Sequence, residues 1–548
     1  MSSVRVHLLG GLNEIGGNKF LVEDGDDRVL LDFGMSFGAR KTYFDSYLQP
    51  RTTTILTDLI DLDLLPDVDG LYRQDLVDLA WEELDSEPPE SAKAYEERTG
   101  EPFVHGALLT HAHLDHFGDM AFLDPDIPVH CTATTQRMLE SIDHLGSGGI
   151  GEEIVEVRER SIEQLGSGAY FPGDDDVKTQ RRERTIETCP VGTAFTIGPF
   201  DVTAVPVDHS VPGAVAFHVR TPSGADIFYT GDLRFHGRLT TRTQRLREYA
   251  EGLEPDLLLA EGTRITDAAA EDEAGVERDV AELLENCPGL GVVEFGWKDT
   301  TRFDTMQQVA AKTDRTLVVD PRLAYLLKQL DHRQDVPSRS PERYDHVEPY
   351  LLRRGTMRYN PSDYTRRKHE AGYKTKWDRD TIKPAWKAND QVTLRDPLAH
   401  LQGGVRATDI RENPQDYLLH LSYWSIQDLI DVDPPPGSRW IRCLTEPFNE
   451  EMALNIDRQR NWLDRFGLDH NLPETPGGPP GALTGLTHVS GHAAGPDLAE
   501  FYRSMAADRI VPIHTEKPRA FHDVQKDVVL FEGKGFAEAA RGEAVVEV

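Results

Sequence analysis

The sequence predicts an α/β protein built from two units. At 548 residues the chain is longer than one hydrophobic core ordinarily supports. Up to residue 262 short β-type runs dominate, among them IPVHCTA, AVAFHVRTPSG and DLLLAEGTR. After residue 263 helical and strand-like runs alternate, as in AGVERDVAELLENC, LGVVEF, TRFDTMQQVAAKT and RTLVVD, which is the pattern of a parallel α/β unit. We therefore expect a β-rich first unit and a second unit that begins near residue 263.

The predicted elements follow one another in a simple order. The first 60 residues hold VRVHLL, KFLVED and RVLLDFG, three short runs that predict a strand meander ending at Asp32. Residues 61 to 100 are acidic and interrupted by proline, so we expect a surface insertion with a helical middle. Residues 474 to 482, ETPGGPPGA, predict a loop. After this loop, RIVPIHTEK and DVVLFEGKGFA return to strands that end in polar residues.

The composition predicts a salt-adapted protein of the cytoplasm. Asp and Glu number 94 against 59 Lys and Arg, a formal charge of -35 spread along the chain, which is typical of a halophilic surface. The four cysteines contain no CxxC pair, so we expect reduced thiols rather than disulfides or a cysteine zinc site. No stretch reaches the roughly 18 apolar residues that cross a bilayer, and the N-terminus does not read as a signal peptide. We therefore expect no membrane association.

Residues 108 to 119, LLTHAHLDHFGD, place three histidines and an aspartate directly after an apolar run. If ALLT is a strand, His111 and His113 keep its period of two and point to the same side, where both imidazoles can bind one cation. Asp115 and His116 are then left for a second cation. A helical HExxH zinc site is excluded because Asp115, not a histidine, stands four residues after His111. The alternative is a solvated polar loop.

Further ligand candidates end other predicted strands. His209 follows the apolar alternation of VPVDHS, Asp232 ends IFYTGD in a glycine turn, and His514 ends RIVPIH. A single histidine or aspartate at a strand end is more often a structural residue than a ligand. Their occurrence together with the HxHxDH cluster predicts a site for more than one metal ion.

These residues resemble, in order, the motifs of metallo-β-lactamase-fold hydrolases: Asp32 in LLDFG, the THAHLDH cluster, His209, Asp232 and His514. The segments GGLNEIGGN, AEGTR, HVSGHA and PIHTEK resemble the β-CASP nucleases among them, and in particular the ribonuclease J family. The resemblance implies a metallo-β-lactamase αββα sandwich with an inserted β-CASP α/β domain. The expected boundaries are 1–262 and 483–548 for the sandwich and 263–482 for the insertion.

The resemblance also implies a role for each motif residue. His111, His113 and His209 would bind one metal, Asp115, His116 and His514 the other, and Asp232 would bridge them. Asp32 would orient the cluster from behind. Glu261, His492 and His514 would be the three β-CASP motif positions. The expected cofactors are two divalent ions, with zinc preferred and manganese as the alternative, since a histidine-rich site with carboxylates suits both.

The remaining catalytic positions follow from the chemistry of phosphodiester hydrolysis. Two metal ions polarise the phosphate and activate water, so what is left is to protonate the leaving oxygen. His492 is the candidate proton donor, with Glu261 orienting it. Ser490 and the amides of Gly491 and Ala493 are candidate phosphate contacts, together with His492 itself. The alternative for SGHA is a plain turn with a capping serine.

Residues 350 to 389 are locally basic in an otherwise acidic chain and mix cations with aromatic rings. Cations contact phosphates while aromatic faces stack on unpaired bases, the combination that binds single strands. The alternative is a solvated face that pairs with acidic neighbours. The candidate nucleic-acid contacts in this segment are Arg353, Arg354, Tyr364, Arg366, Arg367 and Trp377.

The expected function is hydrolysis of single-stranded RNA, as a 5′-to-3′ exonuclease with endonuclease activity left open. The alternatives are a single-stranded DNA nuclease of the same fold, a hydrolase of small esters or thioesters, and a non-catalytic subunit of an RNA-processing complex. The chain ends 34 residues after His514, so we expect no extra C-terminal domain of the kind that some bacterial relatives carry. A homodimer is therefore left open.

Overall fold

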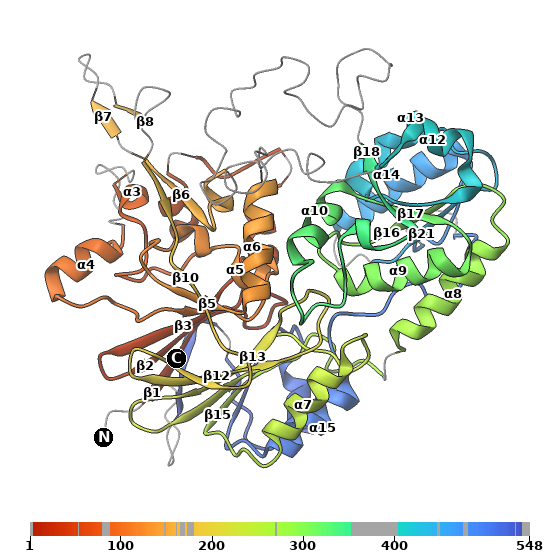
Figure 1. The fold of residues 1–548 in the computed structure, drawn as a ribbon. Helices are drawn as coiled ribbons and strands as arrows, with labels where there is room; N and C mark the ends of the chain where they lie inside the picture. The colour runs from red at the N-terminus through yellow and green to blue at the C-terminus, as the bar shows by residue number, and fades with distance from the viewer. Residues whose placement is uncertain are drawn as a thin grey trace.

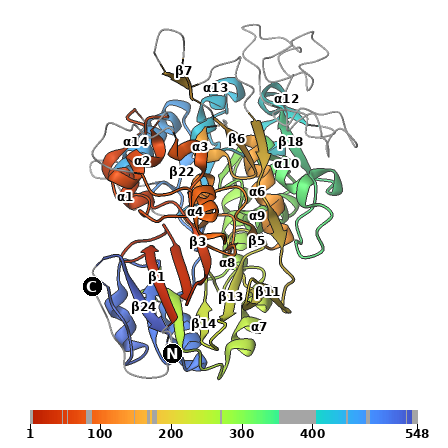
Figure 2. The same cartoon turned by 90° about the vertical axis from the view of Figure 1, so that its left-hand side faces the viewer.

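The computed structural model shows a two-lobed molecule, with a sandwich of two sheets beside a lobe built on a parallel sheet (Figure 1). A view from the side places the parallel-sheet lobe against one end of the sandwich (Figure 2). Buried groups join the lobes: the Arg234 guanidinium donates to Thr301 Oγ1 (2.9 Å), and Tyr325 OH lies 2.8 Å from His144 Nδ1. The structure describes residues 4–45, 47–52, 54–78, 88–146, 149–160, 162–164, 170–172, 180–268, 271–351, 404–445, 450–474, 481–531 and 533–539.

The first sheet of the sandwich begins with the predicted meander and continues with parallel strands. Its order is β10 (Ile186–Thr188), β5 (Val129–Cys131), β4 (Ala107–Leu108), β3 (Asp27–Phe33), β2 (Lys19–Asp24), β1 (Val4–Gly10) and β24 (Gly535–Ala539). Strands β1, β2 and β3 pair antiparallel, whereas β3, β4, β5 and β10 pair parallel. The predicted meander is confirmed. The parallel arrangement puts the ends of β3 and β4 at the same edge of the sheet.

The second sheet faces the first across a shared apolar core. Its order is β11 (Ala194–Ile197), β12 (Phe200–Pro206), β13 (Val215–Arg220), β14 (Asp226–Tyr229), β15 (Leu257–Glu261) and β23 (Ile510–Ile513). Val6 and Phe20 of the first sheet pack in one buried cluster with Phe217 and Leu259 of the second. Alternating inward-facing side chains of this kind are what hold two sheets face to face.

Helices cover both outer faces of the sandwich. Met138 of α6 (Ala133–Leu145) packs in the core outside the first sheet, and Leu246 of α7 (Thr240–Ala250) and Phe501 of α15 (Gly495–Met505) pack outside the second. The predicted αββα sandwich is therefore confirmed. Further elements on this lobe are α1 (Phe37–Tyr43), α2 (Ile55–Asp61), α3 (Gln74–Val77), α4 (Ala92–Thr99), α5 (Leu114–Phe117), η1 (Met120–Phe122), η2 (Ile150–Glu152), η9 (Pro518–Asp523) and the hairpins β6 (Glu156–Glu159) with β9 (Gln180–Glu183) and β7 (Ile162–Gln164) with β8 (Tyr170–Pro172).

The segment from 61 to 100 differs from its prediction as a surface insertion. Leu65, Leu71, Tyr72 and Leu76 are buried in the core between the first sheet and its covering helices. The Arg73 guanidinium is buried as well and binds Glu153 (2.9 Å). The acidic residues dominate the composition, but these apolar side chains pack inward, so the described part of the segment, residues 61–78 and 88–100, belongs to the helical layer.

The second lobe is a sheet in which every neighbouring pair of described strands is parallel. Its order is β19 (Val405–Arg406), β18 (Val347–Leu351), β17 (Thr316–Val319), β20 (Tyr417–His420), β16 (Gly291–Glu294), β21 (Arg439–Arg442) and β22 (Asp469–His470). Buried clusters cover both faces of this sheet. Its helices are α8 (Glu273–Glu285), α9 (Thr300–Lys312), α10 (Pro321–Leu330), α12 (Ala407–Glu412), α13 (Leu429–Val432) and α14 (Glu450–Phe466), with η3 (Pro341–Arg343), η7 (Pro414–Asp416) and η8 (Tyr423–Asp428).

This arrangement confirms the parallel α/β unit predicted after residue 263. The expected domain boundaries at residues 262 and 482 stay predictions. Within the described part of the chain, no helix combines the length and the hydropathy that a membrane span needs.

Candidate metal centre

Strand ends from both sheets of the sandwich meet at one edge, and their polar residues converge there. The loop after β4 carries His111 and His113, and the loop after β12 carries His209. His113 Nδ1 lies 3.1 Å from both His111 Nε2 and His209 Nε2. Asp232, just after β14, places Oδ2 at 3.6 Å from His111 Nε2 and 3.7 Å from His209 Nε2. Four ligand atoms thus surround one point.

A second group shares the same aspartate. His116 Nε2 lies 3.2 Å and His514 Nε2 3.7 Å from Asp232 Oδ2. His514 Nε2 also lies 3.1 Å from Asp115 Oδ2. His514 follows β23, and its backbone is in the left-handed region (φ 50°), which turns the ring toward the cluster. Asp232 belongs to both groups, so one buried carboxylate lies between two sets of possible cation ligands.

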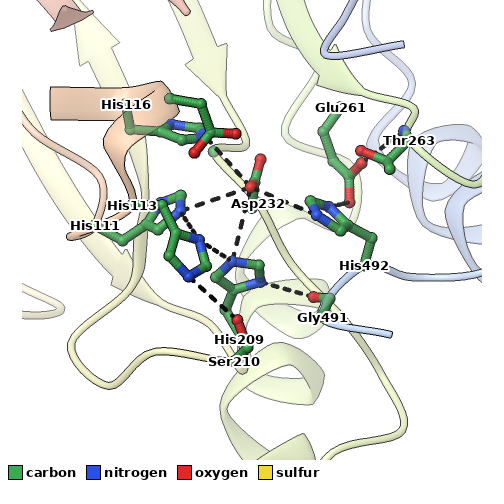
Figure 3. Close-up of polar contacts among 12 residues, drawn as sticks. His111, His113, His116, His209, Ser210, Asp232, Glu261, Thr263, Gly491 and His492 are labelled. Carbon is green, nitrogen blue, oxygen red and sulfur yellow. Dashed lines mark hydrogen bonds and ion pairs between the residues drawn. The ribbon is translucent and has the colours of Figure 1, made fainter. Parts of the chain in front are cut away.

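His492 and Glu261 complete the cluster on the opposite side of Asp232 from His111 and His113 (Figure 3). His492 Nε2 lies 3.9 Å from Asp232 Oδ2, and its Nδ1 lies 3.5 Å from Glu261 Oε1. Glu261 is buried at the end of β15, where its Oε2 accepts from the Thr263 amide (3.0 Å). His492 is 18% exposed, so it is the more accessible member of this pair.

The donor set fits divalent cations. Asp232 is 1% exposed, and among the described residues neither of its carboxylate oxygens has a hydrogen-bond partner; His116 Nε2 has none either. A buried carboxylate without partners is costly, and ring nitrogens that face it without hydrogen-bond geometry do not offset that cost. Imidazole nitrogens and carboxylate oxygens converging on shared points are the ligands that zinc and manganese take. Bound cations would satisfy all of these atoms at once.

The electrostatics around His111, His113 and His209 suit a bound cation. Burial, reinforced by neighbouring histidines, holds the pKa of His111 and His209 well below the usual value, and burial together with Lys298 lowers the pKa of His113 to about 3. These imidazoles are therefore neutral, which metal coordination requires. Burial opposes ionisation of Asp232, but His514, His116 and His492 outweigh it and lower its pKa well below the usual value.

The histidines His116, His209 and His514 each make a second contact through the ring nitrogen that points away from the cluster. His116 Nδ1 lies 2.6 Å from Asp32 Oδ2, and Asp32 also accepts from the Thr110 amide (2.8 Å) and hydroxyl (2.7 Å). Thr263 Oγ1 lies 2.8 Å from His514 Nδ1, and the Gly491 carbonyl lies 2.7 Å from His209 Nδ1. Such partners fix the ring orientation and the tautomer. Asp32 thus lies where the sequence predicts, behind the cluster.

The SGHA turn agrees only in part with its predicted role. The Ala493 amide donates to the Leu233 carbonyl (2.7 Å), and Ala493 is buried, so the predicted phosphate contact through this amide is wrong. The His492 amide donates to Ser490 Oγ (3.1 Å), which makes the serine a cap of its own turn. The hydroxyl of Ser490 and the amide of Gly491 stay predicted phosphate contacts.

Sequence reasoning missed a lysine that reaches the cluster from the other lobe. Lys298 follows β16, and its Nζ donates to the carbonyl of Ala112 (3.4 Å), between His111 and His113. Burial lowers the pKa of Lys298 to about 8, although Asp115 opposes the shift. The available signal was a lysine three residues after the apolar run LGVVEF, in the loop at the carboxyl end of a predicted parallel strand.

The basic and aromatic segment falls outside the described residues. Its candidate contacts stay predictions: Arg353, Arg354, Tyr364, Arg366, Arg367 and Trp377.

With this geometry established, comparisons with known proteins show what the chain is similar to. Residues 87–277 match a β-lactamase superfamily domain, and residues 484–522 match an RNA specificity domain of zinc-dependent metallo-hydrolases. The chain resembles the β-CASP nucleases of the ribonuclease J type. The matched domains contain or adjoin the metal-facing residues, and together with the histidine and aspartate cluster they indicate divalent metal binding.

Curated proteins named ribonuclease J align with much of the chain. That of Sinorhizobium meliloti is 24% identical over 418 residues, 75% of this chain and 57% of that protein. That of Pyrococcus abyssi is 22% identical over 330 residues, 58% of this chain and 59% of that protein, and that of Corynebacterium glutamicum is 24% identical over 298 residues, 53% and 30%. The chain thus spans less than two thirds of the length of these relatives.

A solved structure matches almost the full length of the chain. A protein of unknown function from Enterococcus faecalis V583 superposes with a TM-score of 0.63 at 21% identity, over 98% of this chain and 100% of that one. The likeness shows that the two-lobed fold as a whole occurs in another protein.

Proposed function

We propose that the protein is a dinuclear metal-dependent ribonuclease that hydrolyses phosphodiester bonds in single-stranded RNA, working from the 5′ end. The observation that carries this proposal is the pair of ligand groups that share Asp232. The RNA specificity domain match and the ribonuclease J relatives support RNA as the substrate. The digestion experiment described below tests both the direction of attack and the preference for RNA over DNA.

The chain's own residues would hold the cations in the two groups described. His111, His113 and His209 would bind one ion, Asp115, His116 and His514 the other, and Asp232 both; zinc is preferred and manganese is the alternative. Two such ions supply Lewis-acid stabilisation of the phosphate and lower the pKa of water toward about 7. Asp32 and Thr263 keep the ligand rings in place through the hydrogen bonds to His116 and His514.

His492 is placed to deliver a proton to the leaving oxygen. Its Nδ1 faces the Glu261 carboxylate at 3.5 Å, which leaves Nε2 pointing into the space beside Asp232. With Nδ1 facing the Glu261 carboxylate, a proton on Nε2 would face the reacting phosphate and could pass to the departing 3′ oxygen. Glu261 orients the ring and favours its charged form, since it is buried and held by the Thr263 amide.

Lys298, from the parallel-sheet lobe, places its ammonium group next to the metal-binding loop. Its contact with the Ala112 carbonyl is long, at 3.4 Å, and an ammonium has three N–H donors. A phosphate oxygen of the substrate would offer a charge-assisted partner for the remaining donors. We assign Lys298 to the phosphate next to the one that is cleaved.

The cysteines and the net charge support proposals about the location of the protein and its adaptation to salt. Cys131, Cys189, Cys287 and Cys443 are all buried and free, which suits a reducing compartment, and we propose a cytoplasmic location. The charge of -35 supports a halophilic protein.

The test is digestion of matched nucleic acids by the purified, metal-loaded protein. We expect single-stranded RNA with a 5′-monophosphate to be degraded to mononucleotides, a 5′-triphosphate RNA to be degraded more slowly, and a circular RNA of the same sequence to survive. Degradation of the circular RNA would assign endonuclease activity instead. Faster cleavage of the matching DNA, or hydrolysis of a simple thioester without action on any RNA, would overturn the proposed substrate.

A further inference from the structure

A cavity of about 450 Å³ lies in the parallel-sheet lobe, at the carboxyl ends of its central strands. Residues directly after β16, β17, β20 and β21 line it, and helix α14 closes one side through Asn455 and Gln459. Its volume is in the range of about 300–1,000 Å³ typical of small-ligand sites. None of its lining residues belongs to the metal centre.

The topology of the sheet explains why a cavity forms here. From β16 the chain moves outward through β17, β18 and β19, and it then returns to insert β20 beside β16 and to place β21 on the other flank. The loops that leave β16 and its neighbours therefore run in opposite directions and open a crevice between them. Ligands of parallel α/β sheets bind in this crevice, at the point where the strand order reverses.

Aromatic rings form the walls of the cavity. Trp424 is 78% exposed and meets the Tyr423 ring edge-on at 5.1 Å, so its indole face is open to a ligand. Two other lining residues, Phe295 and His420, stack on each other, with ring centroids 3.9 Å apart and an angle of 10° between their planes. An exposed indole face beside a cavity is a surface on which a planar ligand can stack.

Two charged side chains near these rings, Glu294 and Arg322, differ in the hydrogen bonds and ion pairs that they make within the protein. Glu294 is buried and both its oxygens are used, since they accept from the Tyr423 amide (2.9 Å) and from Trp440 Nε1 (3.1 Å). It therefore holds the aromatic wall, and both of its oxygens are engaged within the protein. Arg322 bonds to Asp320 (2.9 Å) and lies over the ring of Trp297 at 5.9 Å. This guanidinium sits at the cavity as a cation beside an aromatic face.

The cavity is connected to the metal centre through two adjacent residues. Trp297 lines the cavity, and the next residue, Lys298, reaches the Ala112 carbonyl in the metal-binding loop. A chain of nucleotides whose phosphate contacts Lys298 would therefore have its neighbouring base close to Trp297. The two sites are thus placed to act on one strand.

We propose that this cavity binds a nucleotide, with the base stacked on Trp424 and the phosphate facing Arg322. The ligand can come from two sources with the same chemistry, a nucleotide within the bound RNA strand or a free mononucleotide. The first source rests on the proposed nuclease function and the second does not. We commit to the first, because the link through Lys298 joins the cavity to the reacting phosphate.

The test measures binding apart from cleavage. The parent protein and Trp424→Ala are titrated by calorimetry, without added metal, with a ten-nucleotide single-stranded RNA, with AMP and UMP, and with ribose 5-phosphate. Ile430→Ala is the matched control, since Ile430 is an exposed apolar residue next to η8 that does not line the cavity. Trp424 is exposed, so its removal leaves the core intact, which a thermal melt checks.

We expect Trp424→Ala to raise the Kd for the ten-nucleotide RNA by about 10-fold, the usual loss for one stacked base, while Ile430→Ala leaves it unchanged. A loss of AMP and UMP binding with no change for the RNA would overturn the committed source in favour of a free nucleotide. Equal binding of ribose 5-phosphate and AMP, or an unchanged Kd for every ligand in Trp424→Ala, would overturn the nucleotide site itself. If the parent cleaves no RNA but AMP binding still depends on Trp424, the proposed function fails and the nucleotide site stands.

Discussion

The metal centre and the cavity of the parallel-sheet lobe are built in opposite ways. At the metal centre His111, His116, Asp232 and His514 are almost fully buried, and each ring is fixed by a second contact. At the cavity the aromatic ring assigned to the ligand, Trp424, is 78% exposed and makes a T-shaped contact with the Tyr423 ring. The difference separates two tasks: holding charged ligands at fixed distances, and accepting a base whose identity varies.

The two regions differ in how precisely the fold must position their side chains. A partnerless carboxylate and convergent imidazoles are unfavourable without cations, so the fold must enforce their positions from several strand ends at once. Stacking needs one flat surface and tolerates small displacements. We therefore expect substitutions of metal-facing residues to reduce cleavage strongly, and changes farther from the metal centre to have smaller effects.

The largest effect is expected from Asp232→Ala. Because the carboxylate is shared by both ligand groups, we expect cleavage to fall by on the order of 10³-fold or more, since bound cations supply several kcal/mol of transition-state stabilisation. Initial rates on a labelled RNA measure this. Asp201→Ala, an exposed aspartate on β12, is the control and should keep the parent rate. A loss below about ten-fold would show that Asp232 is not at the reacting centre.

His492→Ala separates proton transfer from metal binding. We expect the roughly 10²–10⁴-fold loss that is typical of a missing general acid, with the metal content unchanged. On a nitrophenyl phosphodiester, whose leaving group departs without protonation, the variant should act nearly as fast as the parent. Equal losses on both substrates, or loss of metal, would withdraw the role of proton donor from His492.

Asp32→Asn tests the support behind the metal ligands. The amide can replace only part of the hydrogen bonding that Asp32 gives to His116 and Thr110, so we expect a loss of roughly 10–100-fold in metal affinity or activity. A chelator competition measures the affinity. Loss as large as that of Asp232→Ala would show that Asp32 contacts a cation directly.

Salt should act on the surface and leave the buried centre alone. With a charge of -35 the folded chain repels itself, and the Debye length falls from about 10 Å at 0.1 M to about 3 Å at 1 M. We expect the melting temperature to rise by several degrees between 0.1 and 2 M KCl. A flat or falling melting temperature over that range would contradict the halophilic interpretation.

The sequence predicted the metal centre better than the cavity, for physical reasons. The HxHxDH motif follows an apolar strand, and alternate residues of a strand point to the same side. The local sequence is therefore enough to predict that His111 and His113 lie together. Asp232 and His514 lie far along the chain, and only strand ends and a family resemblance pointed to them. Trp297 and Trp424 come together because β20 inserts beside β16, and no local pattern encodes that order.

Two predictions failed because tertiary contacts decide them. The Ala493 amide looked available in its turn, but Leu233, from another segment, accepts its hydrogen bond. The acidic residues between 61 and 100 suggested a surface, but Leu71 and Tyr72 pack beneath the helical layer. Composition averages over the two faces of such a segment, whereas burial depends on one of them.

The most direct test of the central proposal is the number of metal ions bound per chain. Elemental analysis of the metal-loaded protein should give two ions for the parent, about one for His514→Ala, which removes a ligand of one group, and fewer than one for Asp232→Ala, which removes a ligand of both. Two ions retained by Asp232→Ala, or a single ion in the parent, would contradict a dinuclear centre that shares Asp232.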